Sequence, residues 1–140
     1  NTIGFFITAF VRQGKLGHVT AAETGYYLGQ TEDGRDIVRG PDAAFVSYAR
    51  LPVLPSGYIP LTPDLAIEVV SPTDSADDVQ KKIAIYLEFG TPLVWVIYPK
   101  LRQLVIHTPD GSRTLTAVDT LDGGAVLPGF SLRLSELFGE

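Results

Sequence analysis

The sequence predicts an α/β fold in which helices pack on a mixed central β-sheet. Residues 65–70 and 93–98 are almost wholly apolar and rich in Ile and Val, which is typical of strands covered on both faces. The segment between them has helical spacing, so the three elements favour a βαβ crossover with parallel strands. A turn signal at residues 109–112 joins two further extended segments as a hairpin, which indicates that the remaining pairing is antiparallel.

The N-terminal part is expected to contain one helix and two extended segments. The helix ends near Gly14, because apolar residues follow the helical repeat up to that point. Residues 18–28 are predicted to be one strand, and residues 37–47 an extended segment that a Gly-Pro pair interrupts. Residues 50–63 are predicted to be a loop, because prolines recur along them. The apolar face of the helix consists of Ile3, Phe6, Ile7, Phe10 and Val11.

The C-terminal part continues the sheet. The helix after residues 65–70 begins at a pair of aspartates, whose charge suits the positive end of the helix dipole, and ends at Gly90. Residues 101–107 and 115–118 are predicted to be the two strands of the hairpin. Residues 132–138 are expected to form a short terminal segment that docks on the core through its leucines and phenylalanine.

The composition is that of an ordinary globular protein. The chain has 140 residues, enough for one domain with one core, so we expect residues 1–140 to form a single domain. Cysteine is absent, which excludes disulfides and cysteine metal sites and fits a cytoplasmic protein. Methionine is absent too, so we expect that the N-terminus has been removed or that the sequence is a segment of a longer chain.

Two further properties limit the function. No apolar stretch reaches 18 residues, so no membrane-spanning helix is expected. The net charge is −5, which counts against a large non-specific nucleic-acid surface. It remains compatible with a small phosphate-handling site at which bound cations offset the carboxylates.

Glu68 is the most informative residue, because it interrupts the apolar run of residues 65–70. A buried carboxylate must be ion-paired, hydrogen-bonded, protonated or bound to a metal. Asp64 lies on the same face of the strand, but four extended residues separate the two side chains by about 13 Å. Asp42 begins another strand-like run, residues 42–46. If these strands were neighbours, about 4.8 Å apart, both carboxylates could converge on a divalent cation such as Mg²⁺.

Each of these residues also has an ordinary structural explanation. Asp42 and Asp64 both follow a proline and could cap turns. Glu68 could pair with Lys82 or with an arginine as an internal salt bridge. Lys82 has Asp78 four residues earlier, which is the spacing of a solvent-exposed helical ion pair.

Several segments resemble the Uma-two family of endonucleases, which belongs to the restriction-endonuclease-like PD-(D/E)XK superfamily. The resemblance runs from about residue 3 to residue 138 and is carried by residues 63–72, 78–86, 93–99, 41–46 and 127–131. It implies a restriction-endonuclease-like fold with a mixed central β-sheet flanked by helices. It also implies metal-dependent hydrolysis of phosphodiester bonds, with DNA as the expected substrate and a homodimer as the expected assembly.

The resemblance implies a role for individual residues. Asp42 and Glu68 would hold Mg²⁺ or Mn²⁺, and the backbone carbonyl of Val69 would be a further ligand. The lysine of the motif should fall at position 70, where this chain has Val70. Lys82, in the following helix, matches a lysine that reaches the same site in space. Catalytic roles are therefore expected for Asp42, Glu68 and Lys82.

Two features bear on whether such a site is complete. Tyr86, one helical turn after Lys82, would lie beside it. The superfamily often adds an acid from its first helix, but residues 1–11 contain no Asp or Glu. The alternative is therefore a nuclease-like fold without catalysis, which serves as a binding or assembly module. A site for a small phosphorylated ligand is a third possibility.

Overall fold

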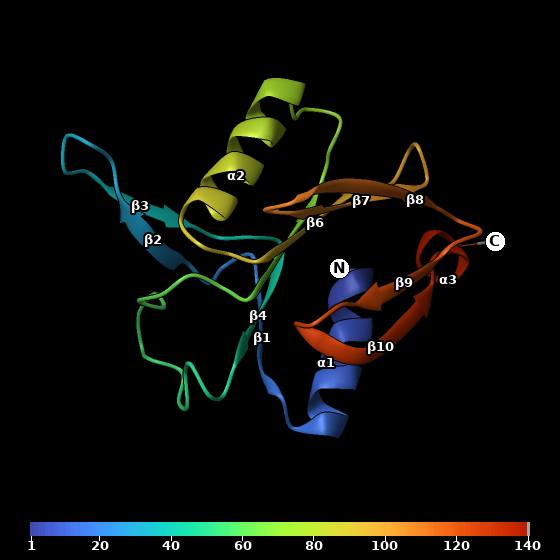
Figure 1. The fold of residues 1–140 in the computed structure, drawn as a ribbon, viewed down its shortest axis with the longest axis horizontal. Helices are drawn as coiled ribbons and strands as arrows, with labels where there is room; N and C mark the ends of the chain where they lie inside the picture. The colour runs from blue at the N-terminus through green and yellow to red at the C-terminus, as the bar shows by residue number, and fades with distance from the viewer. Residues whose placement is uncertain (140) are drawn as a thin grey trace.

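In the computed structural model, which describes residues 1–139, the chain forms three helices and ten strands (Figure 1). The elements are α1 (Thr2–Gly14), β1 (Gly17–Ala21), β2 (Tyr26–Gln30), β3 (Asp36–Arg39), β4 (Ala43–Ser47), β5 (Leu65–Val69), α2 (Ala76–Glu88), β6 (Leu93–Tyr98), β7 (Gln103–Thr108), β8 (Gly111–Thr116), β9 (Thr120–Gly123), β10 (Leu127–Arg133) and α3 (Leu134–Phe138). No helix among these residues is both long and apolar enough to cross a bilayer.

The described residues contain a six-stranded central sheet with the strand order β1-β4-β5-β6-β7-β8. Strands β5 and β6 are parallel and α2 connects them, so the predicted βαβ crossover is confirmed. The other neighbours in this sheet pair in antiparallel fashion, which makes the sheet mixed as predicted. The remaining strands form two hairpins, β2–β3 and β9–β10.

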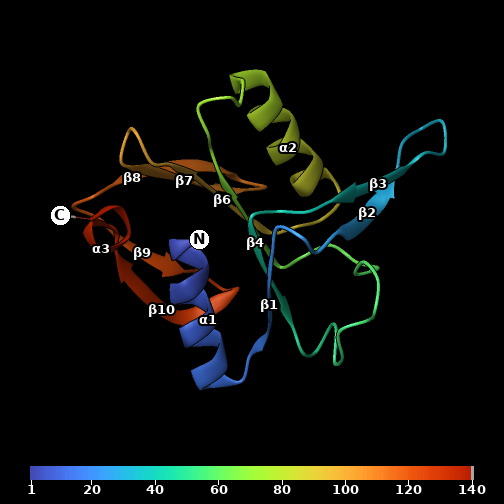
Figure 2. The ribbon, with the colours of Figure 1, turned by 180° about the vertical axis from the view of Figure 1, so that it is seen from behind.

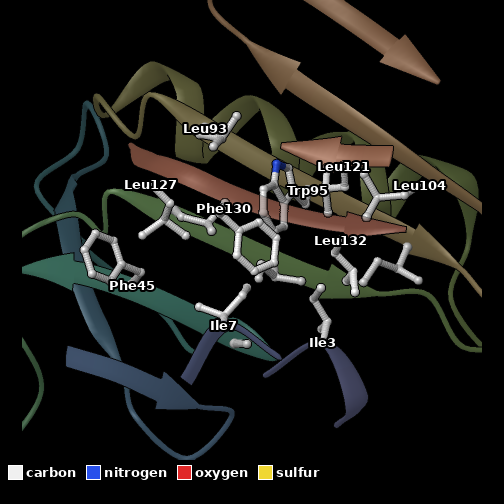
Figure 3. Packing of buried hydrophobic residues seen from close by; sticks show 14 of the residues in the cluster. Ile3, Ile7, Phe45, Leu93, Trp95, Leu104, Leu121, Leu127, Phe130 and Leu132 are labelled. Carbon is white, nitrogen blue, oxygen red and sulfur yellow. The ribbon is translucent and has the colours of Figure 1, made fainter. Parts of the chain in front are cut away.

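The central sheet is covered on both faces. One face packs against α1 and the β9–β10 hairpin, and the other packs against α2 and the β2–β3 hairpin (Figures 1 and 2). Figure 3 shows the first of these two cores, where Trp95 lies beside Phe130 at a ring-centroid distance of 5.9 Å. Side chains of β5 point alternately into the two cores: Leu65 and Ile67 belong to the core on the α1 side, and Ala66 to the core on the α2 side. Glu68 therefore points toward α2.

The first helix agrees with its prediction in both position and ends. The Asn1 side chain caps it by accepting a hydrogen bond from the Gly4 amide at 2.7 Å. Lys15 ends the helix in the left-handed conformation, with φ of 52°. Ile3, Ile7 and Val11 are its buried residues, so the helical repeat identified the face that meets the sheet.

Two expectations about the strands were wrong. Residues 18–28 form two strands rather than one, because a turn in which the Thr24 amide donates to the Ala21 carbonyl (3.0 Å) separates β1 from β2. The strand expected at 115–118 begins at Gly111 instead. Residues 132–138 dock on the core as expected, although they are divided between the end of β10 and α3. The β9–β10 hairpin was not predicted. A register shift between Leu127 and Ser131 breaks the alternation by which β10 could have been recognised.

Candidate functional site

The sequence-predicted residues meet where β4 begins, where β5 ends and where α2 crosses them. Ala43 on β4 pairs with Ile67 on β5 in antiparallel register. One further step of this register sets Asp42 opposite Glu68, and such directly opposed residues have Cβ atoms about 4.5–5.5 Å apart. The expectation that these two strands are neighbours is therefore confirmed, and it brings the two carboxylates to one end of the sheet.

Glu68 is 9% exposed and has two partners from α2. Its Oε2 accepts a hydrogen bond from the Tyr86 hydroxyl at 2.9 Å, and its Oε1 lies 3.8 Å from Lys82 Nζ. Burial raises the pKa of Glu68 above its ordinary value, and the charges of Asp42 and Asp74 raise it further. Tyr86 and Lys82 act in the opposite direction, but burial is the largest effect.

Asp42 is fixed by backbone contacts on both sides. Its Oδ2 accepts a hydrogen bond from the Val69 amide at 2.7 Å, and its own carbonyl accepts one from Asn1 Nδ2 at 2.9 Å. The second bond ties the start of β4 to the N-terminal end of α1. In a strand, the amide and carbonyl of one residue point to the same side, so the Val69 carbonyl faces the edge on which Asp42 lies.

Lys82 and Tyr86 reach Glu68 from consecutive turns of α2, because residues four apart share one face of a helix. Among the described residues Lys82 forms its ion pair with Glu68, although Asp78 lies at the spacing of a solvent-exposed pair. The Lys82 side chain is 40% exposed, so its ammonium group borders solvent. Val70 packs against the core on the α2 side of the sheet, and its apolar side chain adds no polar group near Glu68.

Asp64 lies apart from these residues and has a structural role. Its Oδ2 accepts a hydrogen bond from the Ser47 amide at 2.8 Å, and its Oδ1 lies 3.0 Å from Arg50 Nη1. Arg50 also donates to the Thr62 carbonyl at 2.8 Å, so the pair closes the proline-rich loop. The exclusion of Asp64 as a partner of Glu68 is consistent with this arrangement.

Asp74 is a neighbour of the site that sequence reasoning did not single out. Its Oδ2 accepts hydrogen bonds from the Ser71 amide at 2.8 Å and the Ser71 hydroxyl at 3.1 Å, which lower its pKa. Lys82 lowers the pKa of Asp74 as well, and Asp74 raises that of Glu68, so the three groups act on one another. The signal in the sequence was the turn of residues 71–74 directly after the strand that carries Glu68.

Tyr86 holds the Glu68 carboxylate in place. Burial raises the pKa of the Tyr86 hydroxyl far above its ordinary value, and the neighbouring Glu68 raises it further. The hydroxyl therefore stays protonated and acts as a donor. One oxygen of Glu68 is thereby occupied, and the other faces Lys82.

We expect Tyr86→Phe to lower the free energy of unfolding by about 1–3 kcal/mol near neutral pH, because a buried charged acceptor loses its donor. The loss should shrink as pH falls below 4.5, the ordinary carboxyl value, because Glu68 then becomes protonated in both the folded and the unfolded state. Urea unfolding across this range measures the effect. Tyr58→Phe, on the exposed loop, is the control. Equal stability of both variants at every pH would contradict the role of this hydrogen bond.

The oxygen donors at this place fit a hard divalent cation. Asp42 and Glu68 each use one carboxylate oxygen for a hydrogen bond, and the Val69 carbonyl faces the same edge. Mg²⁺ prefers such a set of one or two carboxylates, with water and substrate oxygens completing the octahedron. Within residues 1–139, no group of three or more His, Cys, Asp and Glu side chains has the geometry of a metal site, so the acidic ligands number two at most.

Asp42 also borders a groove that has a volume of about 720 Å³ and runs between α1 and β1. Asn1 lines this groove together with Thr8 and Arg12, so polar groups follow it from the site along α1. Val69 lines a second cavity of about 300 Å³ at the opposite side of Asn1. The end of the sheet is therefore open to a ligand larger than a metal ion.

The chain matches the family model Uma2, described as "Putative restriction endonuclease", over residues 1–135. The chain belongs to the Uma2 family. The matched range includes Asp42, Glu68 and Lys82. Among curated proteins, none matches the chain significantly.

A solved structure supports the fold of this Uma2 protein. A chain from Anabaena variabilis, titled "a putative nuclease belonging to DUF820", superposes with a TM-score of 0.79 and 22% sequence identity. The alignment covers 95% of the Uma2 chain described here and 74% of the Anabaena chain. The likeness shows that the two proteins share one fold.

Proposed function

We propose that this Uma2 protein is a metal-dependent endonuclease that hydrolyses phosphodiester bonds of DNA. The observation that carries the proposal is the buried Glu68 carboxylate, which stands across a strand pair from Asp42 and 3.8 Å from Lys82. The charge of Asp42 raises the pKa of Glu68, so the carboxylates of Asp42 and Glu68 repel each other in the metal-free protein. A divalent cation would remove that repulsion, and membership of a restriction endonuclease family supports this use of the site.

Asp42, Glu68 and the Val69 carbonyl would hold Mg²⁺ or Mn²⁺. When bound, such an ion would supply Lewis-acid polarisation of the phosphodiester and a more acidic water. Asp42 and Glu68 contribute coordination rather than proton transfer. Their positions are set by the Val69 amide and the Tyr86 hydroxyl, which leave one oxygen of each carboxylate without that hydrogen bond.

Lys82 would contact the substrate phosphate or the attacking water, in addition to its ion pair with Glu68. Its ammonium group borders solvent, so it can orient a water or donate to a phosphate oxygen on which negative charge develops. Its attraction to Glu68 and Asp74 keeps it on the acidic side of the site. A cytoplasmic location, a homodimer and a single domain over residues 1–140 are parts of the same proposal.

The first test is metal binding followed by cleavage. Isothermal titration with Mn²⁺ should give heat for the wild type and at least a tenfold weaker affinity for Asp42→Asn, because the amide lacks the charge of a ligand carboxylate. Asp42→Asn should keep its fold, since the amide oxygen can still accept from Val69. With Mg²⁺ or Mn²⁺ present, the wild type should nick plasmid DNA.

The rival function is a nuclease-like binding or assembly module without catalysis. The net charge of −5 and the set of only two acidic ligands among the described residues favour it. Absence of heat with millimolar Mg²⁺ and Mn²⁺, together with intact plasmid, would exclude the metal-dependent endonuclease and favour this rival.

A further inference from the structure

Arg39 is the last residue of β3 and lies three residues before Asp42 in the sequence. Its side chain shares one face of the strand with Ile37, because side chains alternate along a strand. Ile37 is buried in the core that also contains Tyr86, whereas Val38 between them is exposed. Arg39 is therefore directed toward the side of the sheet on which Glu68 and α2 lie, although it is only half-buried.

The backbone that carries Arg39 is held firmly. Arg39 pairs with Tyr26 in the β2–β3 hairpin, and Tyr26 is fully buried. The next residue, Gly40, passes so close to the chain that a Cβ atom there would lie 2.7 Å from the Ala22 carbonyl oxygen. A rigid backbone between Arg39 and Asp42 fixes where the guanidinium can reach.

Most N–H donors of the Arg39 guanidinium make no hydrogen bond within residues 1–139. Within residues 1–139 it makes one hydrogen bond, from Nη1 to the Val38 carbonyl at 3.1 Å, and no ion pair. A guanidinium has five N–H donors. Ile37 and Tyr86 belong to one core, so β3 sets Arg39 on the α2 side of the sheet.

We propose that Arg39 binds a backbone phosphate that flanks the scissile phosphate of the nucleic acid. The inference rests on the proposed function and adds a substrate-positioning residue to it. The guanidinium fork matches two oxygens of one phosphate. A half-buried arginine that has no carboxylate partner within residues 1–139 is suited to that contact. A flanking phosphate does not change charge during hydrolysis, so the contact should strengthen binding of substrate and transition state equally.

The experiment compares Arg39→Ala and Arg39→Lys with Arg35→Ala as a matched control. Arg35 belongs to the turn between β2 and β3, so its removal changes the net charge equally, but its side chain is 78% exposed and pairs with Asp33 at 3.2 Å. Binding of labelled duplex and single-stranded DNA is followed by fluorescence anisotropy at several salt concentrations. Ca²⁺ replaces Mg²⁺ in these titrations as a hard cation with oxygen ligands.

We expect Arg39→Ala to weaken binding by roughly tenfold to a hundredfold. The slope of log K against log salt should fall in magnitude by about 0.9 for duplex or about 0.7 for single-stranded DNA, which corresponds to one lost phosphate contact. Arg39→Lys should keep most of the slope and lose part of the affinity, since the charge remains without the fork. In cleavage assays Arg39→Ala should raise KM and leave kcat nearly unchanged.

The outcomes separate this inference from the proposed function. If the wild type cleaves DNA and Arg39→Ala matches Arg35→Ala in affinity and slope, Arg39 is not a phosphate ligand and the endonuclease stands. If the wild type neither binds nor cleaves DNA, both proposals fall. Should Arg39→Ala fail to fold, Arg39→Lys decides, because an affinity equal to that of the wild type would overturn the forked contact.

Discussion

Replacement of Glu68 by Gln is expected to lower the rate of DNA cleavage by at least about a thousandfold, while it makes the metal-free protein more stable near neutral pH. The rate falls because an amide is a poor ligand for a hard divalent cation. Stability rises because the amide keeps an acceptor for the Tyr86 hydroxyl and removes a buried charge that the fold disfavours. The two measurements are plasmid cleavage with Mg²⁺ and urea unfolding in EDTA.

The pH dependence of this gain follows from the raised pKa of Glu68. Below the ordinary carboxyl value of 4.5, Glu68 is protonated in the folded and unfolded states, so the two proteins should differ little. As pH rises from there through the higher pKa of the folded state, the wild type must ionise a buried group and loses stability. The advantage of the variant should therefore grow by about 1.4 kcal/mol per pKa unit of the shift.

Bound metal should reverse the order of stability. Mg²⁺ that binds only the folded wild type adds stability in proportion to the logarithm of its concentration, whereas Glu68→Gln should gain little. Glu88→Gln, an identical change at an exposed position of α2, is the control for both measurements. Cleavage by Glu68→Gln at the rate of Glu88→Gln would refute the assignment of this residue.

Lys82→Ala is expected to reduce cleavage by about 100-fold to 1,000-fold, because the site loses its only lysine placed against the buried carboxylate among the described residues. The neighbouring Lys81→Ala removes the same charge from the same helix at an exposed position and should cleave as the wild type does. The pKa of Glu68 should rise further in Lys82→Ala, since Lys82 lowers it in the wild type. The readouts are single-turnover cleavage and the pH dependence of metal binding.

This variant also separates the catalytic hypothesis from the salt-bridge alternative. If Lys82 only neutralises Glu68, Lys82→Ala should lose stability near neutral pH, and the loss should disappear when Glu68 is also changed to Gln. If it acts on the substrate, Lys82→Ala should retain metal binding at high pH and still cleave slowly. Cleavage at the rate of Lys81→Ala would remove Lys82 from the site.

The need of Glu68 for a partner was predictable from residues alone, because the physical demand is local. An ionisable residue in a run of Ile and Val needs a partner, and strand geometry restricts where the partner lies. Asp64 was excluded by its separation along β5, and Asp42 became a candidate at the start of another strand. Their actual proximity depended on the antiparallel β4–β5 register, which no single segment contains.

Other parts of the site depend on tertiary structure that spacing does not specify. Lys82 lies at ion-pair spacing from Asp78, yet it turns to Glu68, because α2 packs with that face over the end of β5. Asp74 belongs to a turn that Ser71 closes, and Arg39, which we propose as a phosphate ligand, lies on the separate β2–β3 hairpin. The ion pair of Lys82 with Glu68 depends on how α2 packs on β5, so the helical and strand repeats carry no signal of it.

The parallel pairing of β5 with β6 has a consequence for how the protein folds. Glu68 can meet Lys82 only after α2 has packed back across β5, and Asp42 joins only when β4 has paired with β5 across the long proline-rich loop. Such non-local contacts bear a high entropic barrier and form late. The site is therefore an end product of assembly of the sheet, and partly folded chains with native helices would lack it altogether.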